Sequence, residues 1–386
     1  MKPYPPVSYS EYLKIDKLLN LQDKRSDQFG VEAHDEMLFI ITHQTYELWF
    51  KQILTELDSV LEVFAQPKIS ENSMGTAVSR VHRVIEIQKL LIQQITVMET
   101  MTPLDFLDFR DMLYPASGFQ SAQNRLLENK LGLKLDQRLT YNSTHYRSYL
   151  SEDEQKRALA SEQSLSLFDS VDRWLARTPF LRVDEFDFWR EYRRTVEAIF
   201  ADDRTTVIQH PSLQEAEKQR NLKEIDSSFE VFRALFDEEK FEDLRAQGHF
   251  RLSYKALHAA LLIQLYRDQP VFNLPFQLIA ALQDLDELMT TWRYRHSLLA
   301  HRMLGRKIGT GGSSGAQYLK DATEKHRIFS DFFNLATFLI PRSQRPELPV
   351  RVREKLGFFY SAGEVPGQTS TRLHSDFNVN EPHVTA

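Results

Sequence analysis

The chain has 386 residues and no cysteine, which excludes disulfides, thiolate catalysis, iron–sulfur clusters and cysteine-ligated haem or zinc. Its 48 Lys and Arg against 54 Asp and Glu give a formal net charge of −6, which argues against a general nucleic-acid binder. Hydrophobic residues make up 42% of the chain, enough for a large core. No apolar signal segment and no run of about 18 apolar residues is present. We therefore expect a cytoplasmic protein with no membrane or nucleic-acid partner.

Apolar residues recur at helical spacing, and we find no strand–turn–strand pattern, so an all-α fold is predicted. Helices are expected over 35–64 and over about 76–98. Their predicted inward faces are Leu38, Ile41, Leu48, Ile53, Leu57 and Leu61 in the first helix, and Val78, Val81, Ile85, Leu91 and Ile95 in the second. A third helix is predicted from the Thr102 cap to near Pro115, and a fourth from Gly118 to about Gly132.

The middle third of the chain is more polar than the rest. Three amphipathic segments are expected between 152 and 236, with breaks at Thr178-Pro179 and around 202–211. Helices are expected again over 254–266, 275–304 and 316–339. The predicted plan is an N-terminal segment (1–34), a helical-bundle core (35–151 and 237–345), a small inserted helical subdomain (152–236) and a C-terminal extension (346–386). Beyond about Gly363 the extension has no periodicity and is predicted to be a mobile tail.

A histidine interrupts the apolar face of the helix expected over 275–304. This face comprises Leu278, Leu282, Leu285, Met289, Trp292, His296, Leu299 and Met303. The ordinary interpretation of His296 is a core histidine satisfied by one hydrogen bond. Trp292, however, lies one turn before it, so a flat ring and an imidazole share one wall. An imidazole that projects from a helix among apolar side chains is a common way to hold haem iron.

His43 is the second candidate, with Phe39 one turn before it on the first helix. Glu47 follows one turn later, so a metal-binding His–Glu pair is conceivable, and His82 and Glu86 repeat the spacing. Di-iron bundles favour Glu-x-x-His, so a non-haem metal site is the weaker interpretation and a solvated pair is the simpler one for His82.

Arg110 follows Phe106 by four residues, and a planar cation beside aromatic rings suits a carboxylate ligand. An ion pair with Asp111 is the alternative. The glycine-rich segment 309–315 matches neither a Walker A motif nor a dinucleotide fingerprint, which leaves a flexible connector or a loop that closes over a polar ligand group. The residues alone thus predict a helical protein with a histidine-lined aromatic pocket.

Six segments resemble the tryptophan 2,3-dioxygenase family, in the family's order, between Tyr9 and Arg342. They are 9–19, 34–51, 99–106, 115–121, 292–296 and 309–315. The resemblance implies a helical-bundle domain that binds haem b, one per subunit, and a homotetramer built as a dimer of dimers. It departs from the family's pattern at Asn124, beside Arg125, which puts the fine tuning of the haem contacts in question.

The resemblance also implies roles for individual residues. His296 would be the proximal iron ligand and His43 the distal histidine that hydrogen-bonds the indole N–H. Phe39, Phe106 and Leu113 would enclose the indole, Arg110 and Thr310 would bind the carboxylate, and Ile40, Ile41 and Thr42 would also belong to the substrate site. Ser117, Gly118, Arg125 and Trp292 would lie at the haem, with Ser117 and Gly118 also near bound O2. Tyr9 and Tyr12 would reach into a neighbouring subunit's site.

The implied reaction inserts both atoms of O2 across the indole C2–C3 bond of L-tryptophan and gives N-formyl-L-kynurenine, the first step of tryptophan breakdown by the kynurenine pathway. Three alternatives remain open. A haem monooxygenase acting on another indole would add one oxygen atom, a haem sensor would show no turnover, and a non-haem metalloprotein would lack a Soret band.

Overall fold

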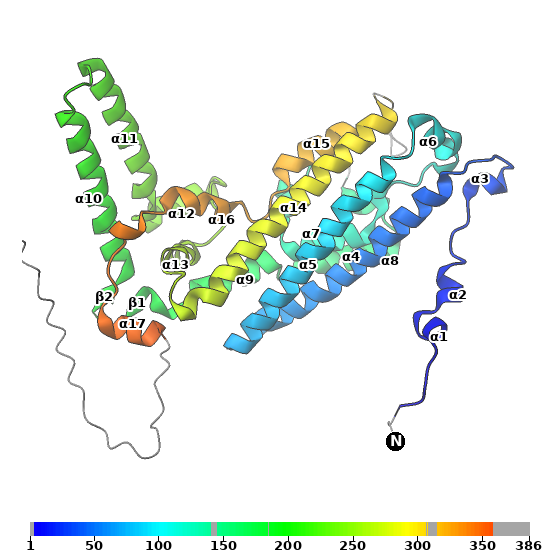
Figure 1. The fold of residues 1–386 in the computed structure, drawn as a ribbon, viewed down its shortest axis with the longest axis horizontal. Helices are drawn as coiled ribbons and strands as arrows, with labels where there is room; N and C mark the ends of the chain where they lie inside the picture. Colours follow the sequence, from blue (N-terminus) through cyan, green and yellow to red (C-terminus); the bar gives the residue numbers. More distant parts are fainter. Residues whose placement is uncertain (1–3, 140–144, 184, 306, 308–314, 358–386) are drawn as a thin grey trace, which may run out of the picture.

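Three long helices run along the body of the molecule (Figure 1). They are α4 (Glu36–Ala65), α5 (Glu71–Met98) and α14 (Asn273–Leu304), and α5 packs against both of the others. The computed structural model describes residues 4–139, 145–183, 185–305, 307 and 315–357. Helices dominate these residues, which confirms the predicted all-α fold.

A capping residue explains where α5 begins, and a buried carboxylate connects α4 to the segment before it. Ser70 accepts a hydrogen bond from the Ser73 amide (3.1 Å), so α5 begins five residues before its predicted start. The buried Glu36 carboxylate at the start of α4 accepts hydrogen bonds from the backbone amides of Arg25 (2.7 Å) and Ser26 (2.9 Å). Glu36 therefore ties the N-terminal segment, with α1 (Tyr9–Leu13), α2 (Ile15–Leu18) and α3 (Arg25–Gln28), to the long helix.

The predicted inward face of the first helix is wrong at two positions. Ile41 and Leu48 are 48% and 52% exposed in the single chain. They lie seven residues apart and so share one face of α4. The buried hydrophobic residues of α4 lie further along the helix, from Phe50 onward, and include Ile53 and Leu57. The inward residues predicted for the second helix are all buried.

The segment between α5 and α7 is short and closely capped. Thr102 and Asp105 form a capping box at the start of α6 (Pro103–Arg110), which 3₁₀-helix η1 (Asp111–Leu113) extends toward Pro115. After 3₁₀-helix η2 (Gly118–Gln120), α7 runs over Ala122–Leu131 and ends at Gly132, whose φ is +121°. The two helices predicted here are thus confirmed.

The middle third contains more elements than predicted. They are η4 (Tyr146–Tyr149), α8 (Glu152–Gln163), α9 (Leu167–Ala176), η5 (Pro179–Leu181), α10 (Phe188–Gln209), α11 (Glu215–Leu235) and α12 (Glu238–Ala246), after η3 (Leu135–Gln137). The break expected around 202–211 falls at the end of that range, because α10 runs unbroken to Gln209 and α11 begins at Glu215. Two strands, β1 (Arg182–Val183) and β2 (Phe186–Asp187), pair as a short antiparallel hairpin that the sequence did not predict.

The helices of the middle third do not all pack in the same way. α8 packs against α7, and α9 packs against α4 and α13 (Tyr254–Leu265), whereas α10 and α11 pair with each other and project from one end of the molecule (Figure 1). Two of the four helices between 152 and 236 therefore belong to the packing of the long bundle. The domain boundaries themselves stay a prediction.

The prediction of one continuous helix over 316–339 is wrong, because the structure divides this range into three elements. The structure has α15 (Gly315–Lys325), α16 (Ser330–Asn334) and η7 (Leu335–Phe338). The chain turns between α15 and α16 because the buried Asp286 carboxylate accepts a hydrogen bond from the Ile328 amide (2.8 Å), while Arg293 donates to the His326 carbonyl (3.2 Å). The remaining elements are η6 (Pro270–Phe272), η8 (Arg342–Gln344) and α17 (Val350–Leu356). Residues 358–386, with the predicted tail, lie outside the described residues.

One large hydrophobic core lies within the bundle, and a smaller cluster lies beside α6. The smaller cluster comprises the buried residues Ala33, Met98, Met101, Phe109 and Met303, with Leu38, Phe39, Phe106, Leu113, Leu299 and Leu304 packed against them. Across the described ranges, no helix has both the length and the apolar character needed to span a bilayer.

Candidate active site

His43 projects from α4 with its hydrogen atom in a defined position. Its Nδ1 lies 2.7 Å from the Phe39 carbonyl oxygen, and a carbonyl can only accept, so Nδ1 carries the hydrogen. In the neutral ring Nε2 is then left as an acceptor. The protein atoms around His43 exclude water from the ring, and this desolvation lowers the pKa of His43 below 6.5. The residue nevertheless stays partly accessible in the single chain. Near neutral pH His43 thus presents a hydrogen-bond acceptor.

His296 projects from α14 and is also neutral. Burial, with a smaller contribution from the nearby His43 imidazole, lowers its pKa to about 4. The two rings, which come from helices more than 200 residues apart in sequence, therefore lie close enough to interact. The buried Nδ1 of His296 has no hydrogen-bond partner among the described residues. The interpretation of His296 as a core histidine satisfied by one hydrogen bond is thus wrong.

An aromatic wall stands beside His43. The Phe39 ring lies 4.0 Å from the His43 ring and 5.8 Å from Phe106, centroid to centroid. Phe109, fully buried, meets both phenylalanine rings edge-on at 5.5 Å. Leu113 packs against the same cluster. The three side chains predicted to enclose an indole are therefore gathered next to the histidine.

Trp292 stands one turn before His296 with its ring 5.6 Å from the imidazole. It also lies 6.2 Å from Phe50, edge-on, and 6.1 Å from Tyr46. The Tyr46 hydroxyl donates to the Leu91 carbonyl (2.6 Å), which holds this aromatic group against α5. The histidine and the tryptophan thus share one wall, as the sequence predicted.

Arg110 ends α6 and is 15% exposed. One of its guanidinium nitrogens, Nη1, lies 3.2 Å from an oxygen of Asp111, the ion pair that the sequence left as an alternative. The Asp111 side chain itself is 90% exposed, so this pair is open to water and contributes little. Because Arg110 is one turn from Phe106, it stands at the end of the aromatic wall.

The loop of Ser117 and Gly118 is held to the histidine helix by Glu47. The Glu47 carboxylate accepts hydrogen bonds from the Ser121 hydroxyl (2.6 Å) and from Gln123 (2.8 Å). Nothing lies within 4 Å of where a Gly118 side chain would begin. Glu47 therefore anchors the loop, and no group of three or more His, Asp or Glu side chains suited to a metal ion occurs among the described residues. This argues against the His43–Glu47 metal pair.

Other predicted site residues lie apart from this group. Tyr9 and Tyr12 on α1 are 76% and 73% exposed. Ile40 is partly exposed and Thr42 is buried, while Ile41 lies on a different face of α4 from His43. Thr310 lies outside the described residues, as does most of the glycine-rich segment. Arg125 is buried and pairs with Glu128 at 3.1 Å.

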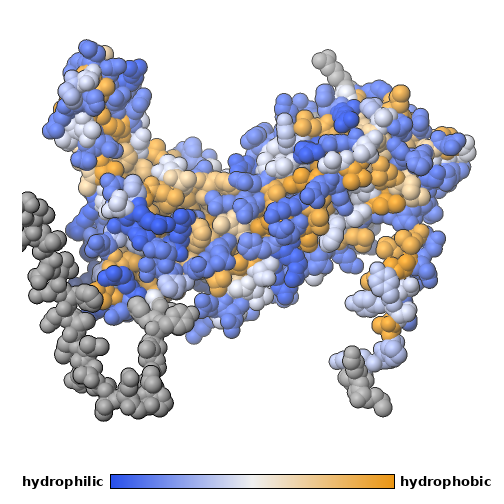
Figure 2. Space-filling view, in the orientation of Figure 1, coloured by the Kyte–Doolittle hydropathy of each residue, from blue (hydrophilic) through white to orange (hydrophobic). Residues whose placement is uncertain are grey.

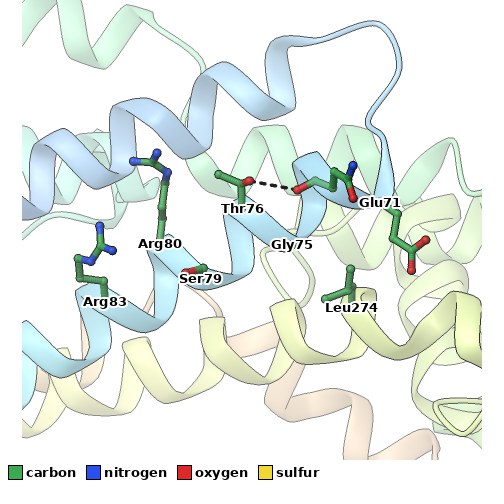
Figure 3. Close-up of a pocket in the computed structure, with 8 residues that line it drawn as sticks. Glu71, Gly75, Thr76, Ser79, Arg80, Arg83 and Leu274 are labelled. Carbon is green, nitrogen blue, oxygen red and sulfur yellow. Dashed lines mark hydrogen bonds between the residues drawn. The ribbon is translucent and has the colours of Figure 1, made fainter.

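Two hollows lie elsewhere on the molecule. One, of about 870 Å³, is lined by residues that include Trp174, Arg177 and Lys355. The other, of about 590 Å³, lies between the start of α5 and Leu274 of α14 (Figure 3). Neither contains a histidine, so the paired imidazoles remain the candidate catalytic group.

The described residues fit a haem. A buried imidazole kept neutral, with one ring nitrogen lacking a hydrogen-bond partner, is suited to bind iron. Trp292 and the aromatic side chains around it provide apolar surface for a flat macrocycle. His43 projects from a different helix, α4. Its acceptor nitrogen, Nε2, would be available to a hydrogen-bond donor of a bound substrate.

Together with comparisons to known proteins, this fold and site define the chain as a helical dioxygenase. A model of the tryptophan 2,3-dioxygenase family matches residues 5–339, so the chain belongs to that family. It is 58% identical to the tryptophan 2,3-dioxygenase of Bdellovibrio bacteriovorus over 92% of this chain and 99% of the relative. The corresponding enzyme of Alteromonas mediterranea is 49% identical over 93% and 99%, and that of Mus musculus 46% over 92% and 86%.

Two residues of the site escaped the sequence analysis. Phe109 was missed because its spacing from Phe106 also suits an ordinary core residue. Glu47 was considered only as a metal ligand, and its partners Ser121 and Gln123 lie 74 and 76 residues away. A contact over that separation leaves no local signal in the sequence.

Proposed function

We propose that this chain binds haem b through His296 and uses O2 to open the indole ring of L-tryptophan. The product is N-formyl-L-kynurenine, in which both oxygen atoms of O2 have been added across the former C2–C3 bond. The observation that carries the proposal is a pair of neutral imidazoles, His43 on α4 and His296 on α14, that lie within electrostatic reach of each other, each beside aromatic rings. Haem, when bound, supplies the redox chemistry that activates O2.

The chain's own residues would orient the substrate. Phe39 and Phe106 would hold the plane of the indole, and Arg110 would bind the carboxylate with its planar guanidinium group, assisted by Thr310. Fixing the ring at the reacting oxygen in this way can remove up to roughly 7–11 kcal/mol of the barrier. Ser117, Gly118 and Arg125 would lie near the haem edge.

His43 would accept a hydrogen bond from the indole N–H. The tautomer supports this role, since Nδ1 is committed to the Phe39 carbonyl and Nε2 is the free acceptor. An indole N–H is far too weakly acidic for imidazole to deprotonate readily. His43 is therefore assigned to positioning the substrate and not to removing its proton.

The active unit would be a homotetramer, a dimer of dimers, in which Tyr9 and Tyr12 complete a neighbouring subunit's site. Several exposed apolar side chains support assembly. They are Leu13, Leu18, Leu19 and Leu21 near the N-terminus, Ile41 and Leu48 on α4, Leu90 and Val97 on α5, and Tyr294 and Leu298 on α14. Figure 2 shows apolar surface on the N-terminal segment, which descends from one end of the molecule.

The test is direct. Purified protein is reduced without oxygen, then given L-tryptophan and air, while the Soret band, the formylkynurenine absorbance and the product mass are followed. We expect a product heavier than tryptophan by two oxygen atoms. One added atom would indicate a monooxygenase, and a Soret band without turnover a sensor. In parallel, His296→Ala should purify with little haem, and full haem occupancy with an unchanged Soret band would refute its role as the ligand.

A further inference from the structure

Glu128 on α7 is a buried carboxylate that several cations share. Its oxygens lie 2.6 Å from Arg138, 3.1 Å from Arg125 and 3.6 Å from Arg293, and 3.7 Å from Nδ1 of His326. Burial opposes its ionisation, but Arg138, His326 and Arg125 together hold the pKa of Glu128 well below its usual range. It is therefore an anion in the folded protein.

This cluster holds more positive than negative charge. All three arginines are nearly inaccessible to water, and Glu128 is the acidic side chain that they share. Arg293 also lies within electrostatic reach of the buried Asp286 carboxylate. Other contacts are to neutral groups: Arg138 donates to Asn129 (2.6 Å) and lies over the Tyr146 ring, and Arg293 donates to the His326 carbonyl. Removing the charge of Glu128 would leave the buried guanidinium groups of Arg125 and Arg138 without an ion-pair partner among the described residues, and Arg293 with the more distant Asp286 alone, which strongly disfavours their present positions.

The partners of Glu128 come from the elements that surround the candidate haem site. Arg293 stands one turn before His296 on α14. Arg125 shares α7 with Glu128 and follows the loop of Gly118, and His326 directly follows α15, the helix after the glycine-rich segment. One carboxylate thus joins the helix of the proposed iron ligand to α7, which bears Arg125, and to the end of α15.

We infer that Glu128 is a positioning residue for haem: its ion pair with Arg293, at 3.6 Å, couples α7 to α14 and so helps to fix where His296 presents its imidazole. The inference rests on the proposed haem function. Its physical basis is that the orientation of a metal ligand is set by the groups that fix the element carrying it. Glu128 touches neither substrate nor iron, so its effect is on the strength and geometry of the His296 bond.

The chain offers a matched control in Glu56. This carboxylate on α4 is also buried and accepts hydrogen bonds from two arginines of α5, Arg83 (2.9 Å) and Arg80 (3.4 Å). Figure 3 shows these two arginines pointing toward the neighbouring helix. Glu56 lies thirteen residues from His43, about 20 Å along α4. Glu56 is therefore also a buried carboxylate paired with arginines, but the partners that the structure describes are on α4 and α5, and none of them is on α14.

The experiment compares Glu128→Gln with Glu56→Gln in the haem-loaded protein. Both variants should lower the thermal stability. We expect Glu128→Gln alone to release haem about 10–100-fold faster to excess apomyoglobin and to shift the iron–histidine vibration in the resonance Raman spectrum. Haem release and vibration equal to those of Glu56→Gln would overturn the inference. A wild-type protein that binds no haem would instead refute the proposed function.

Arg293→Met keeps the inference testable if Glu128→Gln does not fold, because it removes a buried cation and leaves the carboxylate paired. If Glu128 acts through Arg293, this variant should also accelerate haem release, and the double variant should be no faster than the faster single variant. Effects that multiply in the double variant would show independent action and contradict the inference.

Discussion

At the residue scale, the hydrogen atom on His43 Nδ1 has a consequence for pH dependence. The acceptor at Nε2 exists only while the ring is neutral, and burial lowers the pKa of His43 below 6.5. The neutral form therefore persists below pH 6.5, and it is lost only as the pH falls through the lowered pKa. We expect the acid limb of kcat/KM, measured over pH 4.5–8 where the enzyme stays folded, to have its midpoint below 6.5.

The variant His43→Gln serves as the control, since its amide oxygen can accept a hydrogen bond and does not titrate. It should lose the acid limb and keep reduced activity, whereas His43→Ala should lower kcat/KM by roughly 2–12-fold, the effect of about 0.5–1.5 kcal/mol. An acid limb that remains in His43→Gln would assign the titration to another group.

Arg110 leads to a prediction about substrate affinity and not about pH, because its proposed role is to bind the carboxylate of L-tryptophan. Hydrogen bonds to a charged carboxylate contribute about 1.5–3 kcal/mol, so Arg110→Leu should raise KM for L-tryptophan roughly 10–100-fold while the haem spectrum stays normal. Asp111→Asn is the control, since Asp111 is 90% exposed and its ion pair with Arg110 is screened by water. An unchanged KM in Arg110→Leu would exclude the carboxylate clamp.

Some site residues were predictable from the sequence for a physical reason. Phe39 with His43, Phe106 with Arg110, and Trp292 with His296 are one helical turn apart, so their proximity follows from helix geometry alone. The proximity of His43 to His296 could not be predicted in this way, because it depends on how α4 and α14 are arranged around α5. The same holds for Glu128, whose partners on α14 and near α15 are more than 160 residues away in sequence.

At the element scale, the long helices were predictable because their apolar faces are nearly continuous. The prediction of one undivided helix over 316–339 failed because a tertiary contact ends α15. The division after α15 depends on Asp286, which binds the backbone amide of Ile328 from another helix. The break expected around 202–211 begins only after Gln209, because Asp202 and Asp203 are exposed on a helix that buries Phe200 and Val196. Exposed acidic residues are compatible with a helix, so they did not mark its end.

A substitution at Gly132 would test how closely α7 and α9 are packed. Its φ is +121°, and an added Cβ would lie 2.7 Å from Cβ of Phe168 and 2.9 Å from the Ser166 hydroxyl, the cap of α9. Gly132→Ala combines backbone strain of about 1–2 kcal/mol with overpacking of about 1–3 kcal/mol, so we expect it to lower the free energy of unfolding by about 2–5 kcal/mol.

Gly248 is the control for this substitution. Its φ of +86° imposes similar strain, but nothing lies within 4 Å of an added Cβ. Gly248→Ala should therefore cost only about 1–2 kcal/mol. The comparison is made by thermal and urea denaturation of the haem-free and haem-loaded protein. Equal losses in both variants would mean that the α7–α9 contact relaxes at no cost.

At the scale of the whole molecule, the N-terminal segment contributes little to its own subunit's core. None of the residues of α1 or α2 is buried, and Tyr9 and Tyr12, which were predicted to reach a neighbouring subunit's site, are exposed in the single chain. Apolar side chains on such a segment are stable when another surface covers them. Assembly therefore offers the simplest physical account of why the exposed faces of α4, α5 and α14 carry leucine, isoleucine and tyrosine.

This account predicts that two different inactive variants can recover enzymatic activity when their subunits assemble together. One variant carries Tyr9→Ala and Tyr12→Ala with an intact haem site, and the other carries His296→Ala with an intact N-terminus. If the tyrosines of one subunit complete the site of its neighbour, each variant alone should have low activity, and co-expressed mixed tetramers should recover a substantial part of it. Recovery should also require assembly, so mixing the separately purified tetramers without exchange should give none. If co-expression leaves activity at the sum of the two variants while size-exclusion chromatography shows mixed tetramers, the tyrosines act within their own subunit, and the exposed apolar faces serve assembly alone.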